Sequence, residues 1–153
     1  MRSVARLLVF ALLVAVSGCE QRGPTVYVLE GPQTIELQAS ASATQVKVGE
    51  TVELHVERRT TGNWKQVPRN ELKPGQCWTY RPPAEFEPEV AQSVKWEVNP
   101  ENTVQFHTEY RMDQKRLATM MVQGTIQLTP VMDEVKCEEG RTVTGPTLEI
   151  EVS

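Results

Sequence analysis

Apolar and polar residues alternate along most of this chain, the period-two pattern of β-strands that bury one face. In residues 51–57, Val52, Leu54 and Val56 share one side, and charged or polar residues take the other. Helical periodicity is nearly absent. The pattern predicts strands at 25–29, 34–39, 45–57, 93–98, 103–110, 117–122, 125–129 and 147–152. That number of short strands predicts an all-β antiparallel sandwich, and a small closed barrel is the alternative.

Two interruptions divide this pattern. Gly31-Pro32 is expected to separate the first two strands. Residues 60–92 hold half of the ten prolines, together with Gly62 and Gly75. Proline lacks the N–H that a ladder or a helix needs, so we expect neither a central strand nor a helix there. The prediction is one domain over 25–153 with a Pro- and aromatic-rich insertion at about 60–92.

The first residues have the layout of an export signal. Arg2 and Arg6 precede an apolar run from Leu7 to Val16, which is too short to be a permanent membrane span. The ending Val16-Ser17-Gly18-Cys19 resembles the lipobox of bacterial lipoproteins. That resemblance implies a signal peptide over 1–18, cleavage before Cys19, and acyl chains on its sulfur and new amino terminus. An ordinary cleaved signal followed by an unrelated cysteine is the alternative.

The same resemblance implies a location. Two or three acyl chains hold a protein stably on a membrane. Glu20 stands where, in enterobacterial lipoproteins, an aspartate favours inner-membrane retention, so the outer membrane facing the periplasm is favoured over the inner membrane. Residues 19–24 form the lipidated cysteine and a short tether, whose reach is under roughly 20 Å. The domain is therefore expected to lie against the membrane face.

Charge narrows the choice of partner. Loss of residues 1–18 from the 153 leaves 135, and it removes Arg2 and Arg6 from the 16 basic residues. The mature chain then has 14 basic residues against 20 acidic ones. A net negative chain lacks the electrostatic footprint for nucleic acid, and it predicts little attraction for anionic lipid headgroups.

A second resemblance concerns the domain itself. Residues 45–54, which include Val-Gly-Glu-Thr-Val, are similar to the opening of bacterial immunoglobulin-like and polycystic-kidney-type domains. Residues 94–98 resemble their tryptophan-bearing third core strand, and 145–152 resemble their closing strand. The resemblance implies a single immunoglobulin-like antiparallel β-sandwich with Trp96 in its core. The chain departs from these domains in its long insertion and in lacking an inter-sheet cysteine pair beside the tryptophan.

Cys77 and Cys137 remain after Cys19 is assigned. In an exported protein an even pair predicts one disulfide, and the alternative, two metal-binding thiols, lacks a Cys-x-x-Cys spacing. In an immunoglobulin-like sandwich the segments that carry these two cysteines leave the same pole. Closing a loop of about 60 residues predicts about 4 kcal/mol of stabilisation in the chain-entropy model.

The insertion also carries the candidate binding residues. Aromatic and arginine side chains on a cross-linked loop are the usual material of interface hot spots. They predict a contact surface for an envelope protein partner; the alternative is a small satellite core over one sheet. The candidates are Trp64, Trp78, Tyr80, Arg81 and Phe86.

A metal site is a further candidate. His55 and Glu57 share a strand face, as do His107 and Glu109. If the two strands are neighbours, these four side chains could hold a divalent ion such as zinc; otherwise they are solvated faces with cross-strand pairs. The methionines near His107 could bind copper(I), although core filling is the simpler interpretation.

Motifs for catalysis are missing from the sequence: there is no Gly-x-Ser-x-Gly, no His-Glu-x-x-His and no phosphate-cradling glycine loop. We therefore expect neither an enzyme nor a cofactor. The expectation is a lipid-anchored envelope module that binds an envelope partner without catalysis. A metal- or ligand-binding periplasmic lipoprotein and a glycan-contacting structural component are the alternatives.

Overall fold

The computed structural model describes residues 23–82, 84, 86–88, 94–110 and 114–153. The predicted signal segment and Cys19 lie outside them. Within these residues the only helical element is a single 3₁₀ turn, η1 (Arg69–Glu71). The strands are β1 (Thr25–Ala41), β2 (Gln45–Val46), β3 (Thr51–Pro68), β4 (Trp78–Thr79), β5 (Phe86–Pro88), β6 (Lys95–Asn99), β7 (Val104–Tyr110), β8 (Gln114–Met120), β9 (Gly124–Met132), β10 (Val143–Thr144) and β11 (Leu148–Val152).

These strands form two sheets. The first has the order β4-β1-β3-β8-β7, with β5 also paired to β3, and the second has the order β10-β9-β11-β2, with β6 paired to β9. All pairs are antiparallel except β2 with β11. Without the short additions, β1-β3-β8-β7 and β6-β9-β11 reproduce the strand order of the constant-type immunoglobulin sandwich. The predicted all-β antiparallel sandwich is confirmed.

The core lies between the sheets in two clusters. One joins Leu54 and Met120 of the first sheet to Ile126 and Ile150 of the second. The other surrounds Leu37 and Met132 nearer to the β10 side. Trp96 is half-buried and packs against both clusters. Trp96 was expected in the core, and it lies where the two clusters meet.

Strand β1 is longer than its pattern predicted. Gly31-Pro32 does not end the strand; pairing with β3 changes register between Glu30 and Thr34 and then continues. This irregularity is a β-bulge, where Gly31 takes a φ of 78° and the missing N–H of Pro32 costs no ladder bond. The prediction of two separate strands was wrong because a bulge admits both residues within one strand.

Strand β3 also corrects an expectation. It runs on to Pro68, through the first nine residues of the segment in which no central strand was expected. All the prolines of that segment lie at or after position 68, and β1 supplies partners for the residues from Thr60 to Val67, apart from Gly62 at the bulge. The remainder of the insertion adds η1, β4 and β5 along the first sheet.

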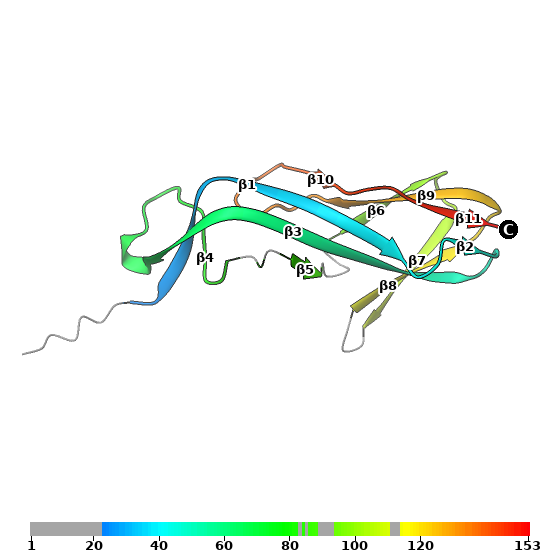
Figure 1. Ribbon diagram of the computed structural model, residues 1–153, viewed down its shortest axis with the longest axis horizontal. Helices are drawn as coiled ribbons and strands as arrows, with labels where there is room; N and C mark the ends of the chain where they lie inside the picture. The colour runs from blue at the N-terminus through cyan, green and yellow to red at the C-terminus, as the bar shows by residue number, and fades with distance from the viewer. Residues whose placement is uncertain (1–22, 83, 85, 89–93, 111–113) are drawn as a thin grey trace, which may run out of the picture.

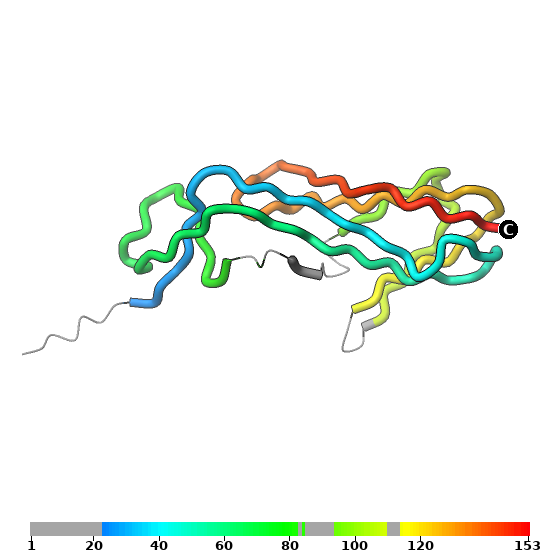
Figure 2. Tube along the Cα trace, viewed as in Figure 1, coloured from blue at the N-terminus to red at the C-terminus, as the bar shows by residue number. Residues whose placement is uncertain are grey.

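The molecule is elongated (Figures 1 and 2). The start of β1, the end of β3, η1 and β4 lie at one end, and the C-terminus lies at the other. We call residues 24–30, 63–73 and 77–81 the β4 end.

Candidate functional site

The β4 end is a small three-stranded sheet built on the ends of β1 and β3. Thr25 pairs with Pro68 on one side of β1, and Val28 pairs with Trp78 on the other. Residues directly opposite each other share a face, so Val28 and Trp78 lie on the same side of this sheet. Val26 and Val28 are 0% and 4% exposed, and they are separate from the two inter-sheet clusters. Trp78, half-buried, therefore belongs in part to a satellite core.

One cation and two rings gather beside this satellite core. The Trp78 and Tyr80 rings meet edge to face, with centroids 5.1 Å apart. The Arg69 guanidinium carbon lies 5.6 Å from the Trp78 ring centre and 5.9 Å from the Tyr80 ring centre, within cation–π range. Tyr80 is 55% exposed. We call these three residues the Arg69–Trp78–Tyr80 cluster.

The cluster lies directly beside the start of the described chain. The backbone N–H of Arg69 donates to the carbonyl oxygen of Pro24 at 3.0 Å. Arg69 was not among the predicted site residues. Its place depends on η1 and on the pairing of β4 with β1, which are long-range features that local sequence does not signal.

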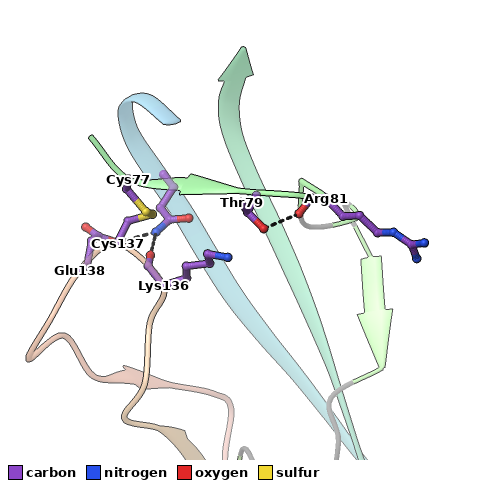
Figure 3. Close-up of a disulfide and its surroundings, with 7 residues drawn as sticks. Cys77, Thr79, Arg81, Lys136, Cys137 and Glu138 are labelled. Atoms are coloured by element: carbon purple, nitrogen blue, oxygen red, sulfur yellow. Dashed lines mark hydrogen bonds between the residues drawn. A yellow bond between two sulfur atoms is a disulfide. The ribbon is translucent and has the colours of Figure 1, made fainter. Parts of the chain in front are cut away.

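The other predicted aromatic and arginine candidates do not join the cluster. Trp64 lies opposite Leu29, and neighbouring positions alternate, so Trp64 faces away from Trp78. Its indole N–H is buried without a hydrogen-bond partner. Arg81 is exposed; its carbonyl accepts a bond from Thr79, and its side chain points away from the disulfide (Figure 3). The Phe86 backbone pairs with Arg59, and its side chain lies outside the described part.

The predicted disulfide between Cys77 and Cys137 is confirmed, with the Cα atoms 5.5 Å apart. It ties the residue before β4 to the β9–β10 loop (Figure 3). Gln33, which is buried, donates to the Lys136 carbonyl and to Glu138, and Arg141 pairs with Glu138. The N–H of Leu29 donates to the Cys77 carbonyl at 3.1 Å. The bridge and these bonds fix the base of the β4 end.

The beginning of the same loop is held by an ion pair. Lys95 of β6 donates a hydrogen bond to Asp133, and this bond, together with the negative charge of Asp133, raises the pKa of the Lys95 ammonium. Both side chains are solvent-accessible, so this pair orients the loop rather than supplying much stability.

Charge is unevenly distributed over the molecule. The β4 end holds four basic residues (Lys65, Arg69, Lys73, Arg81) and two acidic ones (Glu30, Glu71). Lys65 and Glu30 pair at 3.6 Å. Glu138 and Glu139 of the β9–β10 loop lie at the base of this end, because they follow Cys137, which is bridged to Cys77. Beyond this base the β4 end is locally basic, although the mature chain as a whole has a net negative charge.

The proposed metal ligands are not brought together by neighbouring strands. His55 and Glu57 lie on β3 and His107 and Glu109 on β7, and β8 runs between these strands. His55 instead contacts Glu53 at 3.1 Å, as expected of a solvated polar face. Among the described residues no three or more His, Cys, Asp or Glu side chains could hold an ion together. The metal hypothesis fails because it required adjacent strands.

The copper hypothesis concerned Met112, Met120, Met121 and Met132, of which Met112 lies outside the described residues. Met120 and Met132 are 0% and 2% exposed and fill the core, whereas Met121 is exposed. The core-filling interpretation is the one that these three positions support.

No family model, curated protein or solved structure matches this chain. Over the described ranges the structure contains no candidate membrane-spanning helix. The β4 end is therefore characterised by its own geometry: a cross-linked end, locally basic beyond the disulfide, that presents two aromatic rings close to Pro24.

Proposed function

We propose that this protein is a lipid-anchored, non-catalytic interaction module of a bacterial cell envelope, with the Arg69–Trp78–Tyr80 cluster as its contact surface. The observation that supports this proposal most directly is the hydrogen bond from the Arg69 N–H to the Pro24 carbonyl. Pro24 is five positions after Cys19, the proposed acylation site. The cluster would thus be held beside the membrane to which Cys19 is attached.

Confinement to a membrane supports such a role. An anchored module meets membrane-associated partners at a high effective concentration, so modest intrinsic affinity is sufficient for binding. Two or three acyl chains would give a stable anchor. Glu20 favours the outer membrane, with the domain on the periplasmic side.

Rigidity at the β4 end supports a binding surface as well. Trp78 is fixed by β4 pairing and by its contact with Tyr80, and Cys77 is fixed by the disulfide. Aromatic side chains that are ordered before binding lose little conformational entropy when they bind.

The proposal is tested by photo-crosslinking in cells. A photoreactive phenylalanine is placed at position 80, or at position 121 as the matched control, since Met121 is 48% exposed at the opposite end. We expect envelope adducts from position 80, few from position 121, and loss of the position-80 adducts in Cys19→Ser, which should fractionate as soluble. Absence of adducts at position 80 would contradict the contact surface. Adducts and membrane fractionation unchanged by Cys19→Ser would contradict the anchor.

A further inference from the structure

We infer that the Arg69–Trp78–Tyr80 cluster contacts the anionic headgroup layer of the membrane that holds Cys19 and so sets the orientation of the domain. This inference rests on the proposed anchor and names the partner of the proposed contact surface.

Chain length limits how far the cluster can lie from the bilayer. Pro24 is five positions after Cys19, and a fully extended chain spans at most about 3.6 Å per residue, or roughly 18 Å. The Pro24 carbonyl is bonded to the Arg69 N–H. The cluster is therefore the part of the described molecule that the proposed anchor keeps within reach of the headgroups.

The chemistry of the cluster fits that layer. Tryptophan and tyrosine concentrate at membrane–water interfaces, where an apolar ring and a polar tip are both satisfied. Trp78 lies opposite the buried Val28 in the β1–β4 ladder, and Tyr80 is 55% exposed. The Arg69 guanidinium lies over both rings, and a guanidinium pairs readily with phosphate oxygens.

Electrostatics favour the same orientation. The β4 end has four basic and two acidic residues, which leaves ten basic and 18 acidic residues in the rest of the mature chain. An anionic surface would attract this end and repel the remainder, most strongly within a Debye length of the bilayer. Because the C-terminus lies at the opposite end of the long axis (Figure 1), the sandwich would project away from the membrane.

The opposite end would then face the periplasm. It carries the exposed side chains of Val48, Met121 and Val122. The Val48 N–H donates to the carbonyl of Ser153, and the Gly49 N–H donates to the carbonyl of Met120, which places these side chains next to the C-terminus. They cannot reach the bilayer while the β4 end is seated on it.

The test uses the full acylated protein in vesicles of phosphatidylethanolamine with a minor fraction of phosphatidylglycerol. Some of the lipids carry bromine near the headgroup, which quenches tryptophan fluorescence at short range. We expect quenching in the wild type, its loss in Trp78→Phe, and no change in Trp64→Phe. In some molecules the β4 end contacts the headgroups, and in the others it does not. Arg69→Gln and Lys73→Gln should each lower the ratio of the first population to the second about fivefold. Tyr80→Ser should weaken quenching, whereas the matched Met121→Ser should not.

Flotation of the same vesicles separates the two proposals. Protein that floats with the vesicles but shows no Trp78-dependent quenching would overturn the headgroup inference and leave the anchored module intact. Protein that does not float would overturn both. Quenching equal in the wild type and Trp78→Phe would also overturn the inference. So would position-80 crosslinks to a protein alone, with no lipid adduct, because the cluster would then bind a protein.

Discussion

At the residue scale, Gly145 lies close to residues of both sheets. A methyl group at this position would lie 2.7 Å from Pro130 Cγ and 2.9 Å from Leu37 Cβ. Leu37 belongs to β1 in the first sheet and Pro130 to β9 in the second, and Pro130 is almost fully buried. The proline ring cannot rotate away, so an added carbon must push the backbones apart.

We therefore expect Gly145→Ala to lower the free energy of unfolding by about 1–3 kcal/mol, the usual cost of overpacking a core. Urea unfolding measures this change. Gly23→Ala is the matched control, since nothing lies within 4 Å of a methyl group there. Equal stability of the two variants would show that the sheets can separate at Gly145 without cost.

At the element scale, β3 is one strand with two environments. Its first part, with Val52, Leu54 and Val56 buried, faces the second sheet and pairs with β8 as well as β1. Beyond Thr60, which is the last buried residue of the strand, the ladder with β1 continues but the side chains are exposed or half-buried. Both parts form backbone hydrogen bonds with β1, but only the first part buries apolar side chains between the sheets.

We expect amide hydrogen exchange to divide β3 near Thr60. Amides from Val52 to Val56 should exchange only through global unfolding, and those from Thr61 to Val67 through cheaper local opening, because local stability follows buried apolar contacts. Native-state exchange followed by NMR measures both sets. Uniform protection along the strand would contradict this division and would show that β4 and the disulfide stabilise the β4 end as strongly as the sandwich stabilises the core.

At the scale of the whole molecule, the disulfide joins parts that the sheets leave separate. Cys77 precedes β4, Cys137 lies between β9 and β10, and 60 positions separate them. The bridge thus links the β4 end to the second sheet, with which its strands share no ladder in the described sheets. Its geometric role is to hold the contact surface at a fixed angle to the sandwich.

Removing the bridge should cost about 4 kcal/mol of unfolding free energy, because closing a loop of that length restricts the unfolded chain. The variant replaces both Cys77 and Cys137 with serine, which leaves no unpaired thiol at the site. Cys19→Ser is the matched control, and we expect its unfolding midpoint to equal that of the wild-type domain. A loss below about 1 kcal/mol would mean that the Gln33 and Arg141 bonds alone hold the loop in place.

Sequence reasoning went furthest where burial is local. The alternation around Val52 and Leu54 and the closing segment around Ile150 lie in strands β3 and β11, as predicted. It failed where pairing with another strand determines whether a segment is a strand. Residues 60–67 carry no clear pattern of their own, and β1 nonetheless holds them in a ladder.

The candidate site divides in the same way. Trp78 and Tyr80 were found by residue type and by their nearness to Cys77, whereas Arg69 was missed. Trp64 was named with them, but it faces the other side of the sheet. The His-x-Glu pairs failed because alternation gives the face of a strand but not its neighbours, and β8 separates β3 from β7.

The sequence by itself determined the strand faces, the sandwich class and the cysteine pair, because each strand's alternation is set by its own burial. The tertiary structure decided strand order, the continuation of β1 and β3 through glycine and proline, and the meeting of Arg69 with Trp78 and Tyr80. These features depend on hydrogen bonds and packing between residues far apart in the chain, and no local pattern encodes which distant segment supplies them.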